Sequence, residues 1–154
     1  QLDRAVAISI MQSLWDSVEA DTFLYFREEG YLDQVEPYEL MTLFSIADLQ
    51  ISNISSSRMM RTANIPILNS STITPYGIDI VNETHQGSVG VFFDGGYIHA
   101  PDGNEYGVEP HPAHNAIGGL KIARDMAFSF LQMNDILDTC NGNCTFSPDN
   151  LSWN

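Results

Sequence analysis

Apolar residues recur at intervals of three and four along the first part of the chain. This spacing is typical of an amphipathic helix with a wide apolar face. It predicts a long helix from Asp3 to about Glu29, with Gly30 as its stop. The residues that carry the pattern are Val6, Ile8, Ile10, Met11, Leu14, Trp15 and Val18.

A second, shorter apolar pattern follows Pro37. Proline is favoured as the first residue of a helix because it has no N–H group to leave unpaired. The pattern predicts a short helix that ends before Leu49 and is paired with the first helix. Its apolar positions are Leu40, Leu43, Phe44 and Ala47.

Short apolar runs separated by polar residues occupy the middle of the chain. Residues 49–51, 64–68 and 77–81 predict strands, with Ser55-Ser56-Ser57 and Thr74-Pro75 in the gaps between them. Residues 88–93 and 97–99 flank Asp94-Gly95-Gly96. An Asp-Gly turn between two apolar runs predicts a β-hairpin, because both turn positions require positive φ.

A polar loop over residues 101–107 leads to a late helix that begins near Pro112. The order of elements predicts an α+β fold, in which the long N-terminal helix and the late helix pack on a small, mainly antiparallel β-sheet. A chain of 154 residues with 44% hydrophobic content suits one domain over residues 1–154. The apolar positions of the late helix are Leu120, Ala123, Ala127, Leu131 and Ile136.

The net charge of the chain limits the classes of molecule that it is expected to bind. Twenty Asp and Glu against six Lys and Arg give a formal charge of -14, which repels phosphate backbones and anionic lipids. Nucleic acid is therefore not expected as a partner. A solvated acidic surface, a cationic ligand and a divalent metal all remain compatible with this charge. No run of ~18 uncharged apolar residues occurs, so no membrane span is expected in this fragment.

Two features indicate a secreted or cell-surface protein. The glycosylation pattern Asn-x-Ser/Thr occurs five times, whereas chance predicts about 1.6 occurrences. Cys140 and Cys144 enclose Gly142, and this spacing predicts a small disulfide loop. Metal-binding thiols are the alternative, but no second cysteine pair accompanies them. The sequon asparagines are Asn53, Asn69, Asn82, Asn143 and Asn150.

The candidate chemistry lies just before the late helix. Two imidazoles and a carboxylate close together predict either a binding segment or a transition-metal site, although no established ligand motif is present. The loop with Asp94, Asp102, Asn104 and Glu105 is an ordinary turn cluster or a calcium loop. Glycans attached at the sequons would leave the segment from His99 to His114 uncovered. The candidate binding residues are His99, Asp102, Glu105, Glu109, His111 and His114.

His111-Pro112 at the start of a late helix resembles the segment that supplies the catalytic histidine in SGNH esterases. That family also needs a serine after a strand, and Ser17 lies within the predicted first helix, so its roles are not carried over. The layout of a long helix, a small sheet and a hairpin also resembles extracellular Cache-type sensor modules and pilin globular domains.

Three classes of function follow. The preferred one is an extracellular ligand-binding or protein-interaction module, with a protein or a small molecule as its ligand. The second is a self-assembling structural subunit of a surface filament, as the resemblance to pilins implies. The third is a secreted hydrolase that uses His111 and His114. No cofactor is indicated.

Overall fold

The computed structural model describes residues 2–15, 23–24, 27, 36–82, 84–98 and 112–152. The chain divides into two compact units, Gln1–Tyr38 and Glu39–Asn154. The first contains α1 (Leu2–Trp15), which confirms the start of the predicted N-terminal helix. Most of its predicted continuation, including Gly30, lies outside the described residues. No helix in the described part of the chain is long and apolar enough to span a membrane.

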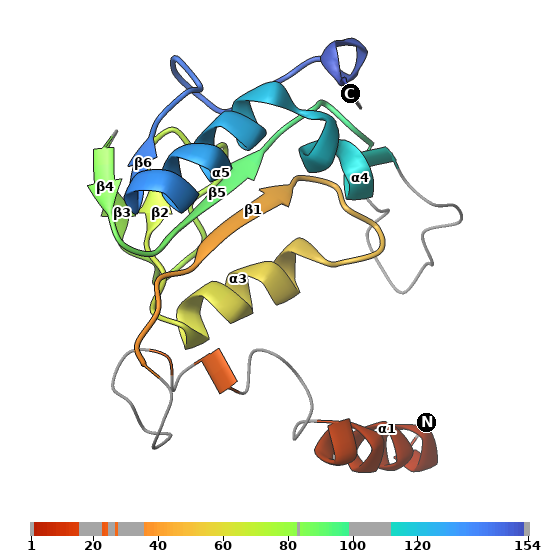
Figure 1. Cartoon of the computed structure of the whole chain (residues 1–154). Coiled ribbons are helices and arrows are strands. Elements are labelled where there is room, and N and C mark those ends of the chain that lie inside the picture. Colours follow the sequence, from red (N-terminus) through yellow and green to blue (C-terminus); the bar gives the residue numbers. More distant parts are fainter. Residues whose placement is uncertain are drawn as a thin grey trace. The chain divides into compact units, whose positions relative to one another are not determined.

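A four-stranded parallel sheet forms the centre of the second unit (Figure 1). Its strand order is β1–β5–β2–β3, and β1 pairs with β5 along its whole length. A separate antiparallel pair joins β4 to β6. The protein therefore has a mixed α/β fold, and the prediction of a mainly antiparallel sheet is wrong. The strands are β1 (Met41–Ser45), β2 (Ile67–Leu68), β3 (Ile80–Val81), β4 (Thr84–Gln86), β5 (Val89–Phe93) and β6 (Asp135–Leu137).

Helices cover both faces of β5. Val89, Val91 and Phe93 belong to a buried cluster with residues of α5 (Lys121–Met133). A Cβ added at Gly90 would lie on the other face of the strand, 2.8 Å from Sδ of Met60 in α3 (Asn53–Thr62). In Figure 1, α3 and α5 lie on opposite sides of the sheet. Burial on both faces explains why this strand is continuously apolar.

The predicted helix after Pro37 is wrong, because residues 41–45 form β1. A short apolar run fits a buried strand as well as a helix. Pairing with β5 decides between the two, and it places Leu43 opposite Val91.

The segment predicted as a strand at residues 49–51 and a loop at Ser55-Ser56-Ser57 is a turn followed by α3. The Ser52 hydroxyl accepts the Ile54 N–H at 3.3 Å, which caps the helix. Only Ser56 and Met60 are buried in α3. Its apolar periodicity is therefore too weak to predict a helix. The predicted strands at 64–68 and 77–81 are confirmed in part, as β2 and β3.

The predicted hairpin after β5 is also wrong. Residues 97–98 form no strand, and residue 99 lies outside the described residues. The Asp94 carboxylate instead accepts the Gly96 N–H at 2.7 Å, the kind of local turn that Asp favours. The main chain of Asp94 is bonded to Cys144 O and Phe146 N. The chain beyond β5 therefore pairs with the C-terminal segment.

The predicted late helix is confirmed in part, as two helices, α4 (Pro112–Gly119) and α5. Its predicted position Ile136 lies beyond α5, in β6, so that part of the prediction is wrong. Leu120 has extended backbone angles and separates them. Asn134 ends α5 in the left-handed conformation, a common helix stop. Ala123 and Met126 bury the inner face of α5 against the sheet.

Candidate functional site

The candidate site lies at the carboxyl edge of the parallel sheet. β1 and β5 end side by side, with Ser45 opposite Phe93, and the Ile46 N–H donates to Phe93 O at 2.8 Å. Ligands of open α/β sheets bind outside the carboxyl ends of the strands. At this edge a hydrogen bond joins the loop after β1 to the first turn of α4.

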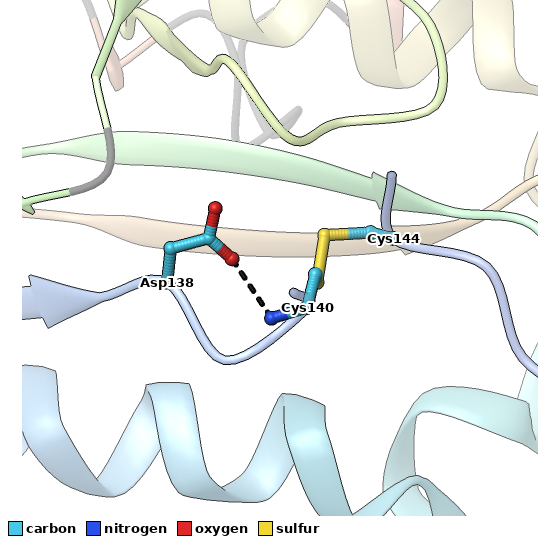
Figure 2. A group of neighbouring side chains, drawn as sticks. All are labelled: Asp138, Cys140 and Cys144. Carbon is cyan, nitrogen blue, oxygen red and sulfur yellow. Dashed lines mark hydrogen bonds between the residues drawn. A yellow bond between two sulfur atoms is a disulfide. The ribbon is translucent and has the colours of Figure 1, made fainter. Parts of the chain in front are cut away.

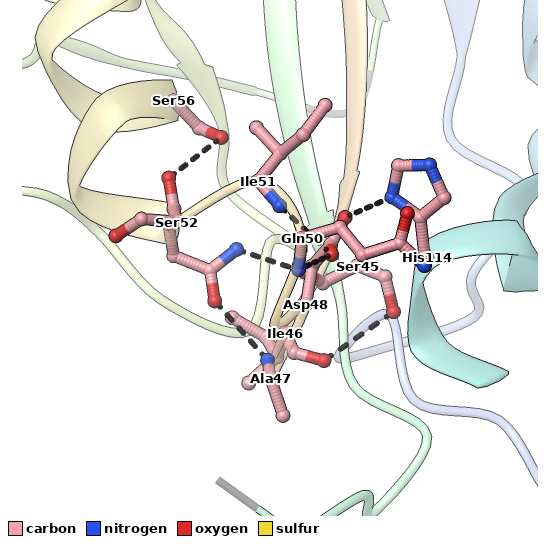
Figure 3. Close-up of polar contacts among 10 residues, drawn as sticks. Ser45, Ile46, Ala47, Asp48, Gln50, Ile51, Ser52, Ser56 and His114 are labelled. Carbon is pink, nitrogen blue, oxygen red and sulfur yellow. Dashed lines mark hydrogen bonds and ion pairs between the residues drawn. The ribbon is translucent and has the colours of Figure 1, made fainter. Parts of the chain in front are cut away.

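That hydrogen bond joins Asp48 to His114 (Figure 3). Asp48 Oδ2 lies 2.9 Å from Nδ1 of His114, the third residue of α4. Asp48 Oδ1 accepts the main-chain N–H groups of Gln50 at 2.8 Å and Ile51 at 3.0 Å. These three bonds fix the direction of the carboxylate. We refer to Asp48 and His114 as the carboxylate–imidazole pair.

Asp48 is held in its ionised form. Burial is the largest single influence on the pKa of Asp48, and it raises that pKa. Hydrogen bonds from Ile51, Gln50 and His114 lower the pKa and together outweigh burial. The pKa of Asp48 therefore lies below its ordinary value. An ionised carboxylate can only accept hydrogen bonds. His114 Nδ1 therefore carries a proton in this contact, and in the neutral form of the ring Nε2 is an acceptor.

The pair is accessible to a ligand. The His114 side chain is 30% exposed and the Asp48 side chain 12%. The histidine thus contacts solvent while the carboxylate behind it is largely covered. Histidine is the side chain best suited to exchange a proton near neutral pH, and a carboxylate on Nδ1 sets the tautomer that it presents.

The structure describes one of the six predicted binding residues, His114. His99, Asp102, Glu105, Glu109 and His111 lie outside the described residues, so their roles stay predictions. The pairing of His114 with Asp48 was missed. The available signal is that Asp48 directly follows an apolar run, but that run fits a helix as well as a strand with a functional carboxyl end.

The predicted disulfide between Cys140 and Cys144 is confirmed (Figure 2). The Cys140 N–H donates to Asp138 Oδ1 at 2.8 Å. Asp138 and both sulfurs form a group of metal-ligand types. Cysteine binds a metal ion as a free thiolate, whereas these two sulfurs are bonded to each other. This group is therefore a structural link, not a metal centre.

The sequon asparagines differ in their surroundings. Asn69, Asn82, Asn143 and Asn150 are exposed, whereas Asn53 is half-buried at the start of α3. Exposure makes the first four accessible to modification. Glycosylation at all five stays a prediction.

A cavity of about 250 Å³ lies at the other edge of the sheet, where β2 and β3 begin. Arg61 and Asp79 supply its charged groups. The Arg61 guanidinium donates to Tyr76 O at 3.3 Å. This cavity is separate from the carboxylate–imidazole pair and provides an alternative place for a ligand.

No protein-family model, curated protein or solved structure matches the chain.

Proposed function

We propose that the chain is a secreted or cell-surface module that binds a small polar ligand beside the carboxylate–imidazole pair. The observation that carries this proposal is the 2.9 Å contact between Asp48 and His114 at the carboxyl edge of a parallel sheet. The disulfide and the four exposed sequon asparagines support an extracellular location.

The chemistry of the pair defines the class of ligand. When His114 Nδ1 donates to Asp48, Nε2 of a neutral ring is free to accept a hydrogen bond from a ligand. The net charge of -14 disfavours anionic ligands. A neutral or cationic molecule with N–H or O–H groups therefore fits best.

NMR titration tests this proposal. A panel of amino acids, sugars, nucleosides and amines is added singly to the labelled protein, and the His114 ring signals are followed. We expect a binder that shifts these signals and whose affinity falls about tenfold in Asp48→Asn. That substitution moves the ring proton to Nε2 and leaves the ligand's donor facing another donor, which costs about 1–3 kcal/mol.

Asp125→Asn is the matched control. It removes the same charge from an exposed position on α5, where Asp125 is paired with Lys121. Its affinity should equal that of the wild type. A binder that shifts signals around Arg61 and Asp79 instead, or that is equally weakened by both variants, would refute the assignment of the site.

A secreted hydrolase is the second candidate. A carboxylate on Nδ1 orients a histidine for general-base catalysis, in which Nε2 takes a proton from water or from a hydroxyl nucleophile. Hydrolysis of p-nitrophenyl acetate measures this activity. His114→Gln and Asp48→Asn should abolish it and Asp125→Asn should retain it, whereas equal rates in all three proteins would exclude this candidate.

A further inference from the structure

Asn53 is joined through both atoms of its amide to the loop that carries Asp48. Its Nδ2 donates to Ser45 O at 2.8 Å, and its Oδ1 accepts the Ala47 N–H at 3.1 Å. The two bonds bracket Ile46, at the point where β1 ends. The first residue of α3 thus holds the chain just before the carboxylate–imidazole pair.

The side-chain amide of Asn53 satisfies both bonds at once. A main-chain carbonyl can only accept and a main-chain N–H can only donate. The side chain at position 53 must therefore present one donor and one acceptor. Aspartate would place an oxygen against Ser45 O, and alanine would make neither bond.

The conformation that these bonds stabilise is unusual. Ala47 has φ 63°, in the left-handed region, although it carries a Cβ. This conformation is unfavourable for residues other than glycine. Asp48 follows directly, so the direction of its carboxylate depends on this turn.

The same amide belongs to the sequon Asn53-Ile54-Ser55. An N-linked glycan is attached to Nδ2, the atom that donates to Ser45 O. The half-buried amide differs from the four exposed sequon asparagines, because both its nitrogen and its oxygen already have structural partners. A glycan would replace the second hydrogen of Nδ2 and would have to fit beside both bonds.

We propose that Asn53 is a positioning residue for the carboxylate–imidazole pair and that it carries no glycan in the folded protein. The importance of the pair for ligand binding rests on the function proposed above. The positioning itself does not, because it is measured without any ligand.

Two single variants distinguish the effect of losing the Asn53 amide from the effect of losing the sequon. Asn53→Ala and Ser55→Ala both destroy the sequon, but only Asn53→Ala removes the amide, since the Ser55 side chain is exposed on α3. Each full-length protein is secreted from a glycosylating host. Hydrogen exchange of the Ala47 amide and the ¹⁵N signals of the His114 ring are then recorded.

We expect Asn53→Ala to accelerate exchange of the Ala47 amide about fivefold to tenfold, the equivalent of one lost hydrogen bond. It should also weaken the Nδ1–H signature of His114. Ser55→Ala should match the wild type in both measurements. Equal behaviour of the two variants would overturn the proposal.

Peptide mass spectrometry of the wild type keeps the proposal testable if Asn53→Ala does not fold. Glycosidase leaves aspartate at each occupied asparagine. An unmodified Asn53 supports the proposal, and a glycan on Asn53 of the folded protein overturns it. A failed ligand screen would refute the proposed function alone, because none of these measurements uses a ligand.

Discussion

Replacing Asp48 by asparagine separates the two roles of its carboxylate. Asparagine keeps one oxygen for the N–H groups of Gln50 and Ile51, which now lie 2.8 and 3.0 Å from Oδ1. It places an NH₂ group where Oδ2 faces His114. Because that group only donates, His114 Nδ1 must accept and the ring proton moves to Nε2. Asp48→Asn should therefore reverse the tautomer while the loop is retained.

Asp48→Ala, by contrast, removes all three hydrogen bonds. A hydrogen bond contributes about 1 kcal/mol, and we halve this for Gln50 and Ile51 because both residues are exposed to water. The hydrogen bond to the partly exposed His114 adds about 0.5 kcal/mol. The loss is about 1.5 kcal/mol for Asp48→Ala and about 0.5 kcal/mol for Asp48→Asn, by the same principles.

Urea denaturation measures the two free energies of unfolding. Long-range ¹H–¹⁵N spectra, recorded at alkaline pH where the imidazole is neutral, report which nitrogen of His114 carries the proton. An Nδ1–H tautomer that persists in Asp48→Asn would refute the reasoning, as would equal destabilisation by the two substitutions. Asp125→Asn, which removes only the exposed ion pair with Lys121, should leave the tautomer of His114 unchanged.

Three further predictions concern the fold and its pH dependence. Gly90→Ala should lower the free energy of unfolding by about 1–3 kcal/mol, because its Cβ would stand 2.8 Å from Sδ of the buried Met60; thermal denaturation checks this. Replacing Cys140 and Cys144 by serine should lower the free energy of unfolding by about 2 kcal/mol, because the unfolded chain gains the entropy of the opened loop; urea denaturation measures this. Since folding lowers the pKa of Asp48, its stabilisation is present above about pH 4 and is lost as the pH falls through the folded pKa. Acid titration should therefore destabilise the wild type more than Asp48→Asn.

Local patterns in the sequence predicted some elements well. The late helices follow from the spacing of residues such as Ala123, and the strand at residues 89–93 from its continuous apolar run. The disulfide followed from the spacing of Cys140 and Cys144. In each case the physical cause lies within a short stretch of chain.

Long-range pairing could not be predicted in the same way. Met41 pairs with Val89 in parallel, and nothing near Met41 specifies a strand distant in sequence as its partner. Without that pairing the helix prediction for residues 40–47 fits equally well. The same limit applies to the site, since Asp48 and His114 meet only after the sheet and α4 have formed.

A crystal structure of the protein with the strongest binder from the panel tests the central claim most directly. It should show the compound at the carboxyl edge of the sheet, with an N–H or O–H group donating to His114 Nε2 and the Asp48–His114 contact at 2.9 Å retained. A compound bound in the cavity of Arg61 and Asp79, with no contact to His114, would contradict the account.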